Sequence, residues 1–384
     1  MLLKKEQCCG CSACEQVCPS KCISMKPDKE GFLVPEINRS KCTSCGMCEH
    51  VCPIYNKKVG CYEIKAYAAK CKEQQGGVRG KSSSGGMFWC FARYILKQGG
   101  LVVGVAMGNN CFFSHHIAIT NESELYKLLG SKYVQSYKGN IFSSVRDYLK
   151  QGKYVLFSGL PCEISGLINF IPIDLQDKLY TIDLICHGVP SPLVWQKYLS
   201  EKVSNAKSVE FRNKSSGWKN FSIKIYSDEN CITEEVGQNI YMKGFLEHLY
   251  LRNSCHNCKF KGIQRSSDIT LGDFWNVNDF VPEFDDDKGV SLVFIQSQKG
   301  SCLFSSILDC YELDYKEVDV AKAGLSNPMM LYSSKPHKKR DKFFKLLNKN
   351  KPVIKSIKKL TRRTFLIRAL SKVKSIIKNV NRGV

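Results

Sequence analysis

The sequence lacks any uncharged apolar run approaching the roughly 18 residues that would span a bilayer. It also lacks an apolar signal segment, because the first six residues lead directly into a cysteine-rich motif. Acidic side chains are scarce, at 35 against 57 Lys and Arg. No nucleic-acid recognition motif accompanies this positive charge, so nucleic acid is not an expected partner. We expect a cytoplasmic protein that at most lies on the inner face of the membrane.

The composition is that of a folded protein. Of the 384 residues, 43% are hydrophobic and 11% are aromatic, which suits one or two domains with hydrophobic cores. The net charge of +22 is concentrated in residues 335–384, which hold 18 Lys and Arg and one acidic residue. This tail therefore carries +17, and the preceding 334 residues carry only +5.

The 21 cysteines are the most informative part of the composition. Two runs near the start share the spacing C-x2-C-x2-C-x3-C-P. The first run contains Cys8, Cys11, Cys14 and Cys18, and the second contains Cys42, Cys45, Cys48 and Cys52. Two-cluster bacterial ferredoxins have this spacing, and the fourth Cys of each run ligates the other cluster. Cys9 and Cys22 lie off the spacing and are expected to pack around the clusters.

The repeat predicts a ferredoxin-like module with two 4Fe–4S clusters over residues 1–60. One cluster takes Cys8, Cys11, Cys14 and Cys52, and the other takes Cys42, Cys45, Cys48 and Cys18. A pair of zinc sites is the alternative, but zinc motifs normally come as spaced pairs of ligands. Between the runs, residues 23–26 and 32–36 are typical of a β-hairpin.

Beyond the module we expect a mixed α/β fold, of α+β or α/β class, in regions 61–150 and 151–325. Strands are predicted at 65–69, 101–106, 116–120 and 290–296, and helices at 87–98 and 241–252. The clearest unit joins strands 154–157 and 180–185 through helix 162–170. A right-handed crossover makes these strands parallel, so both end at the same edge of the sheet. Ligands of open α/β sheets bind at that edge, where we place the main site.

Two loops reach this edge. They contain Ser158, Gly159, Pro161 and Cys162 after one strand, and Cys186, His187 and Gly188 after the other. Cys162 and Cys186 would complete a third 4Fe–4S cluster with the C-x2-C pair Cys255 and Cys258. A structural zinc at these four residues and simple burial of free cysteines are the alternatives. His187 is a candidate catalytic residue as a proton donor, although such a residue often only satisfies a turn.

A Gly/Ser-rich segment precedes the helix predicted at 87–98. It consists of Lys81, Ser82, Ser83, Ser84, Gly85 and Gly86. Backbone N–H groups at the start of a helix suit a pyrophosphate, and an N-capped loop is the plain alternative. Because an electron-carrying module lies upstream, we expect the segment to bind FAD.

The basic tail has a helical pattern. Its apolar residues recur every three or four positions, at Leu366, Ala369, Leu370, Val373, Ile376, Ile377 and Val380. Lys and Arg occupy the positions between them. The pattern predicts a basic amphipathic helix on an anionic membrane surface, and a helix docked on its own protein or on an acidic partner is the alternative.

Several motifs follow the ferredoxin repeat in a fixed order. They are the segment 81–86, Ser-Gly-Leu-Pro-Cys-Glu at 158–163, Asp-Leu-Ile-Cys-His-Gly at 183–188, Cys-His-Asn-Cys-Lys at 255–259 and Ser-Asp-Ile-Thr-Leu-Gly-Asp at 267–273. This order over residues 1–320 resembles the beta subunits of coenzyme F420 hydrogenases and dehydrogenases, most of all a bacterial branch associated with polysaccharide biosynthesis. The family usually has Thr where this chain has Leu160, which removes a hydroxyl group near the cofactor.

The resemblance implies an iron–sulfur flavoprotein oxidoreductase. Electrons from a ferredoxin-like donor would reach FAD, bound between the 81–86 loop and the two strand-end loops. The flavin would exchange a hydride with coenzyme F420 or with another small organic substrate, such as a polysaccharide precursor. A non-catalytic electron-transfer subunit of a larger redox complex is the alternative.

Overall fold

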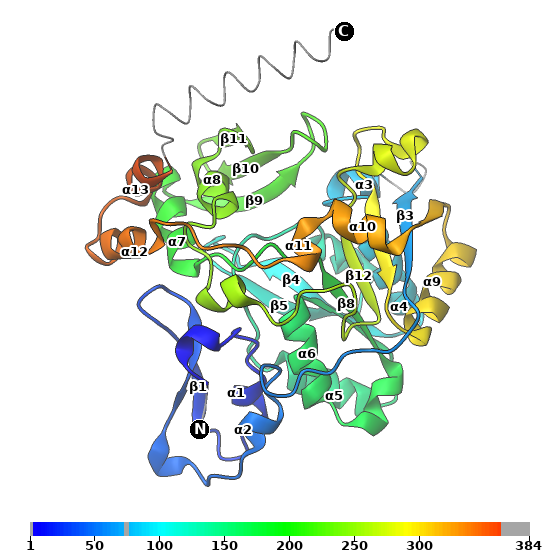
Figure 1. Cartoon of the computed structure of the whole chain (residues 1–384), viewed down its shortest axis with the longest axis horizontal. Helices are drawn as coiled ribbons and strands as arrows, with labels where there is room; N and C mark the ends of the chain where they lie inside the picture. The colour runs from blue at the N-terminus through cyan, green and yellow to red at the C-terminus, as the bar shows by residue number, and fades with distance from the viewer. Residues whose placement is uncertain (1–2, 73–76, 362–384) are drawn as a thin grey trace.

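The computed structural model describes residues 3–72 and 77–361, which form a small N-terminal module attached to a larger α/β body (Figure 1). The module contains η1 (Lys5–Gln7), α1 (Ala13–Val17), β1 (Ile23–Pro27), β2 (Leu33–Ile37), η2 (Arg39–Lys41) and α2 (Met47–His50). Strands β1 and β2 pair antiparallel, which confirms the predicted hairpin. One cysteine run therefore precedes the hairpin in the sequence and the other follows it. Each run contains a short helix, α1 in the first and α2 in the second.

The two cysteine loops have the same backbone shape. Left-handed residues occur two and four positions after the first Cys of each run, at Gly10 and Ser12 and again at Ser44 and Gly46. Their φ angles are +72° and +66° in the first loop and +55° and +74° in the second. Such turns bend the chain around a central point before the helix begins. The sequence repeat is thus a structural repeat.

A nine-stranded mixed sheet forms the centre of the body. In spatial order its strands are β14 (Leu313–Val318), β3 (Lys65–Cys71), β13 (Ser291–Ile295), β12 (Ile269–Asp273), β8 (Leu179–Leu184), β7 (Val155–Gly159), β4 (Leu101–Met107), β5 (Ser114–Ile119) and β6 (Ser136–Tyr137). Strands β7 and β8 are parallel, as predicted, and β4 and β5 are antiparallel neighbours. Strands from regions 61–150 and 151–325 alternate in this sheet, because β3 lies between β14 and β13. The two regions thus contribute strands to one sheet.

Helices cover both faces of the sheet, as period-two burial of the strands requires. Val102 and Leu156 face α4 (Met87–Lys97) and α9 (Gln298–Cys310). The neighbouring residues Val103 and Phe157 face α5 (Ile141–Lys150) and α6 (Pro161–Phe170) on the other side. Short segments complete the body: α3 (Val78–Lys81), η3 (Glu122–Leu128), η4 (Ile173–Lys178), η5 (Asn253–Asn257), η6 (Val277–Asp279), η7 (Pro282–Phe284), α10 (Val320–Ser326) and α11 (Pro328–Leu331).

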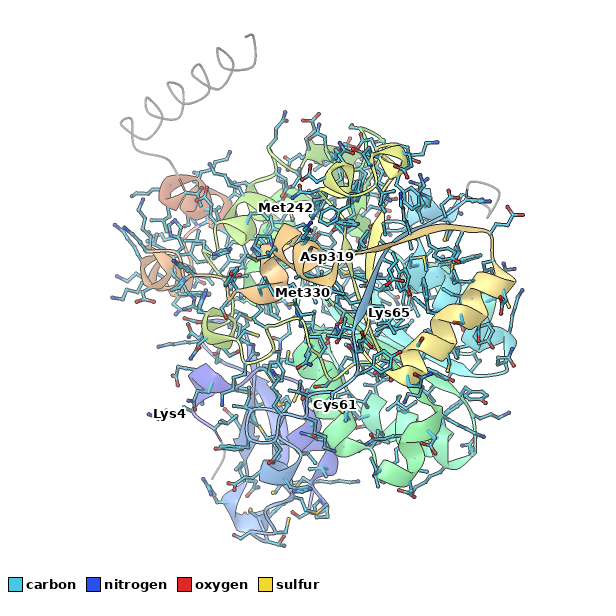
Figure 2. All side chains as sticks on the ribbon, turned by 45° about the vertical axis from the view of Figure 1, so that its right-hand side comes forward. Lys4, Cys61, Lys65, Met242, Asp319 and Met330 are labelled. Atoms are coloured by element: carbon cyan, nitrogen blue, oxygen red, sulfur yellow. The ribbon has the colours of Figure 1, made fainter. Side chains whose placement is uncertain are left out.

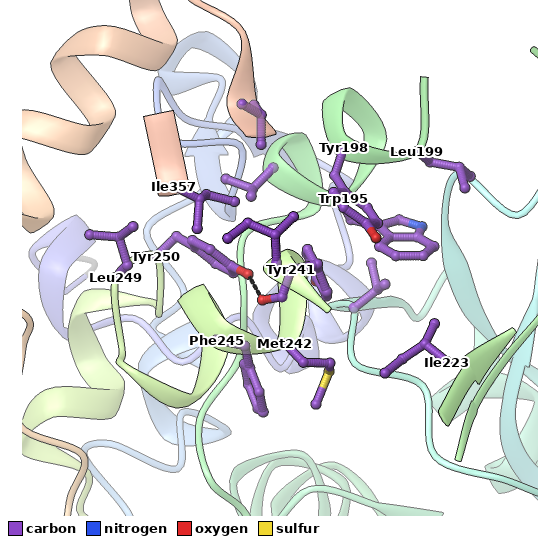
Figure 3. Close-up of a cluster of buried hydrophobic side chains, with 14 of the residues drawn as sticks. Trp195, Tyr198, Leu199, Ile223, Tyr241, Met242, Phe245, Leu249, Tyr250 and Ile357 are labelled. Atoms are coloured by element: carbon purple, nitrogen blue, oxygen red, sulfur yellow. Dashed lines mark hydrogen bonds between the residues drawn. The ribbon is translucent and has the colours of Figure 1, made fainter. Parts of the chain in front are cut away.

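A second, three-stranded sheet packs on an aromatic cluster above the module. It consists of β9 (Ala206–Asn213), β10 (Ser222–Ser227) and β11 (Cys231–Glu235), beside α7 (Pro192–Lys202) and α8 (Ile240–Leu246). Figure 3 shows Trp195 and Tyr198 of α7 against Tyr241 of α8, all fully buried. The helix predicted at 241–252 is shorter than expected. It ends at Leu246 because His248 adopts a left-handed φ of +60°.

The first part of the predicted basic tail belongs to this fold. Helices α12 (Arg340–Asn348) and α13 (Val353–Leu360) bury Phe343, Phe344 and Ile357 in the aromatic cluster. The folded region therefore continues well past residue 325. Residues 362–384, with the predicted amphipathic pattern, lie outside the described residues. No helix within residues 3–72 and 77–361 is both long and apolar enough to cross a membrane.

Two buried arginines attach the module to the body. Arg252 donates to the carbonyl oxygens of Cys8 at 2.8 Å and Leu33 at 2.6 Å. Arg340 pairs with both carboxylate oxygens of Glu30 from the other side. In Figure 2 the chain leaves the module near Cys61 and enters the central sheet at Lys65. Because these bonds are buried and charge-assisted, they hold the module in a fixed position against the body.

Candidate functional site

The ferredoxin thiols of the two predicted ligand sets, called the first and the second group, are close neighbours in the module. In the first group, burial raises the pKa of Cys14, and the neighbouring thiols of Cys8 and Cys52 raise it further. Cys11 is buried beside Cys14. In the second group, the pKa of Cys48 is raised by burial and by nearby Cys45 and Cys18, and Cys42 lies close to Cys22. Because Cys48 also neighbours Cys14, the division of the eight thiols into two crossed ligand sets stays a prediction.

The two groups differ in exposure. Cys11 in the first group is only 7% exposed and packs against α6 of the body. The second group lies in the loop at residues 39–47, where Cys45 is exposed. The first group is therefore the inner one, next to the body, and the second group is the outer one, next to solvent.

A third group of thiols lines a cavity of about 110 Å³ between the module and the body. Its cysteines are Cys162, Cys186, Cys255 and Cys258, together with Cys9 of the module. Backbone N–H groups of Val189 and Phe260 donate to the sulfurs of Cys255 and Cys258, each at 3.4 Å. Burial raises the pKa of Cys186 to about 11 and that of Cys255 to about 12.

The surroundings of this cavity suit a negatively charged cluster. Lys259, Lys261 and Arg265 line it and would offset the charge of four thiolates. Within residues 3–72 and 77–361, no three His, Cys, Asp or Glu side chains come close enough together to hold a single metal ion. Four cysteines around one cavity are a ligand set that a 4Fe–4S cubane takes.

Cys9 lies between the inner group and this third group. Its thiol neighbours those of Cys11 and Cys162. The sequence placed Cys9 only as a packing residue, because it falls outside the ligand spacing. Its position in the lining of the thiol cavity puts a residue of the module beside the cysteines of the body.

A second, larger cavity of about 610 Å³ opens at the carboxyl ends of β7, β8 and β12. Its lining includes Ser82, Ser83, Ser84 and Gly86 of the Gly/Ser-rich segment, and Ser158, Gly159, His187 and Gly188 of the strand-end loops. These segments lie far apart in the sequence and meet at one site. Most of the remaining lining is apolar, which is typical of sites for large organic cofactors.

Three predicted residues lie elsewhere. Lys81 is exposed at the end of α3, and it does not line the cavity because its helix turns away. Gly85 packs against the backbone, where a Cβ atom would lie 2.5 Å from the carbonyl oxygen of Ala69. Pro161 lines the thiol cavity instead.

The large cavity contains polar atoms that have no hydrogen-bond partner in the described part of the chain. Ser82 Oγ is one of them, next to the N-terminus of α4, and His187 Nε2 is another. Burial lowers the pKa of His187 to about 4, with smaller effects from His248 and Lys261. His187 is thus neutral at pH 7. A pyrophosphate at the helix N-terminus and a ring system near His187 would satisfy these atoms, so the residues fit a flavin dinucleotide.

The two cavities share a wall. Cys9 and the segment Cys186–Val189 line both of them. A group held by Cys186 on one side of this wall is therefore adjacent to a group bound beside His187 on the other.

Buried ion pairs hold this wall and its surroundings in place. The sequence did not indicate these pairs. Arg212 pairs with Asp273 at 2.9 Å and donates to the Ser83 carbonyl at 3.2 Å, which orients the Gly/Ser-rich loop. Glu163 accepts a hydrogen bond from the Leu160 N–H at 2.9 Å and pairs with buried Lys138. Glu163 occupies the third position of α6, a capping signal that was readable in the sequence.

Comparisons with known proteins give separate matches for the N-terminal module and for the larger body. Residues 152–321 match the family model for the C terminus of the coenzyme F420 hydrogenase/dehydrogenase beta subunit, and residues 7–56 match a 4Fe–4S dicluster domain. The coenzyme F420-dependent sulfite reductase of Methanocaldococcus jannaschii is 25% identical over 198 residues, which are 50% of this chain and 29% of that protein. The chain thus spans less than a third of this curated relative.

A solved structure is also similar. It is a chain from the F420-reducing NiFe hydrogenase complex of Methanosarcina barkeri, at 18% identity and a TM-score of 0.46, covering 80% of this chain and 92% of that chain. The matches identify a 4Fe–4S dicluster domain at residues 7–56 and, at residues 152–321, a region similar to the C terminus of the F420 hydrogenase/dehydrogenase beta subunit.

Proposed function

We propose that this iron–sulfur protein is a flavin-dependent oxidoreductase that holds FAD in the large cavity and a third 4Fe–4S cluster in the thiol cavity. The shared wall at Cys9 and Cys186–Val189 carries the proposal, because it puts the two sites in contact. When bound, the clusters supply single electrons, and the flavin collects two of them for hydride transfer.

The residues of the chain have distinct parts in this proposal. Cys162, Cys186, Cys255 and Cys258 hold the third cluster, and the N–H groups of Val189 and Phe260 bond to two of the ligand sulfurs. Hydrogen bonds to ligand sulfurs tune the reduction potential of a cluster. Ser82 and the N-terminus of α4 bind the flavin phosphates.

His187 is the proposed proton-handling residue. Its ring packs against the Phe245 ring with the ring centres 4.8 Å apart, and Nε2 has no partner in the described part of the chain. A neutral ring that is protonated on Nδ1 keeps the lone pair on Nε2. His187 Nε2 is thus available to accept a proton or a hydrogen bond inside the cavity.

A deazaflavin such as coenzyme F420 is the substrate that the cavity suits best. The lining is largely apolar, and Trp275 at its edge stacks on Trp218 with the ring centres 4.7 Å apart. Such a platform suits a flat aromatic ring system. A polysaccharide precursor is the second substrate class, since sugar rings also pack on aromatic faces.

A second candidate function is that of an electron-transfer subunit without its own substrate. One observation favours this second function. The region matched by this chain makes up only 29% of the sulfite reductase, so in that protein the matched region is accompanied by further sequence. In this case a partner protein completes the reaction. Whether the protein is a flavoenzyme or an electron-transfer subunit, the basic tail would hold it on the anionic inner face of the membrane.

The cofactor content after anaerobic purification tests the proposal. We expect about twelve iron atoms, a matching amount of acid-labile sulfide and about one FAD per chain, without zinc. A protein with iron but no flavin would contradict the flavoenzyme and favour the electron-transfer subunit. Turnover of coenzyme F420 by the purified chain alone separates the two functions, since only the flavoenzyme needs no partner.

A further inference from the structure

We propose that the outer end of the ferredoxin module is the docking surface of the electron donor, and that this donor is an acidic redox protein. The surface consists of Lys21, Arg39, Lys41, Cys45 and Met47 and is called the entry face below. This inference rests on the proposed function and adds the point at which electrons enter and the charge of the protein that supplies them.

Exposure points to the outer cysteine group. Cys11 of the inner group packs against the body, and the third group lines the cavity between the module and the body. In the outer group Cys45 is exposed, and so are its neighbours Ser44 and Gly46. Electron transfer between proteins requires close approach, so a donor reaches this group first.

The charge of the entry face comes from both halves of the cysteine repeat. Lys21 follows Cys18 by three residues, and Arg39 and Lys41 directly precede Cys42. Because Cys18 and Cys42 belong to the same thiol group, these cations flank one cluster site. All three are exposed, and none forms an ion pair within residues 3–72 and 77–361.

Acidic side chains near the entry face do not cancel this charge. Exposed Lys and Arg in residues 18–50 are Lys21, Lys26, Lys29, Arg39 and Lys41, against the exposed Glu36 and the half-buried Glu49. Glu30 is buried and paired with Arg340, and Asp28 accepts backbone N–H groups in the hairpin turn. The module therefore presents net positive charge to a partner.

The centre of the entry face is apolar. Met47 is 43% exposed directly after the exposed Cys45 loop. An apolar centre with charges around it is the usual anatomy of a protein interface. Complementary charge speeds encounter and selects the partner, so a donor with acidic residues around its own redox centre fits this surface.

The electron balance at this surface is simple. The donor, a reduced ferredoxin or flavodoxin, gives up one electron and is oxidised by one unit, and the outer cluster is reduced by one. No bond forms or breaks, and no proton moves between the proteins.

Charge reversal tests the proposal on the full holoprotein. The triple variant Lys21→Glu/Arg39→Glu/Lys41→Glu is mixed anaerobically with a reduced acidic two-cluster ferredoxin, and bleaching of the chain's clusters is followed. We expect the second-order rate at low salt to fall at least about tenfold, because steering is lost. The rate of reduction by dithionite and the iron content should match the wild type.

A matched control carries the same change of charge on the body, at exposed Lys150, Lys153 and Lys322. This variant should keep the wild-type rate with ferredoxin. An equal loss in the control, or no loss in the entry-face variant, would overturn the proposal. If the triple variant loses iron, the wild-type protein alone gives the test. Its rate with acidic ferredoxin should fall steeply between low and high salt, and a salt-independent rate would contradict the docking surface.

This readout depends only on the ferredoxin clusters. A protein without flavin would fail the proposed function and still give a result here, so the two failures are distinguishable.

Discussion

The thiol of Cys9 lies next to that of Cys162, where the ferredoxin module meets the strand-end loop after β7. Cys9 also neighbours Cys11, a predicted ligand of the inner cluster. One side chain thus contacts a ligand of each of two neighbouring cluster sites. In the proposed relay, Cys9 is a positioning residue and not a ligand.

Replacing Cys9 should change cluster potentials without removing clusters. Cys9→Ala removes a polar thiol beside two predicted ligand sulfurs, which should shift the potentials of the inner and third clusters by tens of millivolts or so. Cys9→Ser keeps a polar group at this position and should restore most of the shift. Redox titration followed by electron paramagnetic resonance measures this. Loss of one cluster's iron in Cys9→Ala would instead identify Cys9 as a ligand.

The cysteine repeat and the strands of the main site were predictable because their signals are local. The hairpin between the runs and the parallel pair β7 and β8 follow from alternation and crossover handedness, and both are confirmed. The insertion of β3 between β14 and β13 was not predictable, since periodicity does not reveal which distant strands pair. Helices α12 and α13 were hidden by their many lysines, although Phe343 and Phe344 carry the packing signal.

The site was predictable to a similar extent. Cysteine spacing indicated the ligand sets, and the strand-end argument brought Cys162 and Cys186 to one edge, where the structure also brings Cys255 and Cys258. Arg212 was missed because an arginine in an alternating strand is usually a surface residue. Its role depends on Asp273, which is distant in sequence.

Removing the Ser82 hydroxyl should weaken flavin binding. Ser82 Oγ is buried in the large cavity without a partner in the described part of the chain, so a bound phosphate would supply one. Ser82→Ala should raise the dissociation constant for FAD about five- to tenfold, the usual worth of one hydrogen bond. Ser144→Ala, at a half-buried serine of α5 that does not line the cavity, is the control. Equal FAD affinity in both variants would place the phosphates elsewhere.

The buried Arg340–Glu30 pair should be essential for attaching the module. The two side chains are 5% and 9% exposed, so Arg340→Leu leaves an unpaired buried carboxylate. This should lower the free energy of unfolding by about 3–5 kcal/mol. The double variant Arg340→Leu/Glu30→Leu removes both charges and should recover part of the loss. Denaturant unfolding under anaerobic conditions measures the free energy of unfolding of each variant. A double variant that is less stable than Arg340→Leu would contradict this account.

His116 should make stability depend on pH. Burial lowers its pKa from 6.5 to about 4, with Glu163 opposing the shift and Lys138 and His115 adding to it. Between these values the unfolded chain binds more protons than the folded protein. The free energy of unfolding should therefore fall as pH drops from 6.5 to 4, by at most about 3 kcal/mol from this group.

The variant His116→Gln should flatten that dependence. The exposed His50 provides the matched control, as His50→Gln should keep the wild-type slope. Unfolding midpoints at several pH values, read by tryptophan fluorescence, give the slopes. Identical slopes in wild type and His116→Gln would show that this histidine titrates normally in the folded protein.

The most direct test of the relay is reduction of the flavin through the third thiol group. Reduced ferredoxin is mixed anaerobically with the FAD-loaded wild type, with Cys258→Ala and with the exposed-cysteine control Cys302→Ala, and flavin bleaching is recorded. Cys258→Ala should lose about four iron atoms and slow flavin reduction at least about a hundredfold, while its ferredoxin clusters are still reduced at the normal rate. Cys302→Ala should behave as the wild type. Flavin reduction at the wild-type rate in Cys258→Ala would contradict the relay.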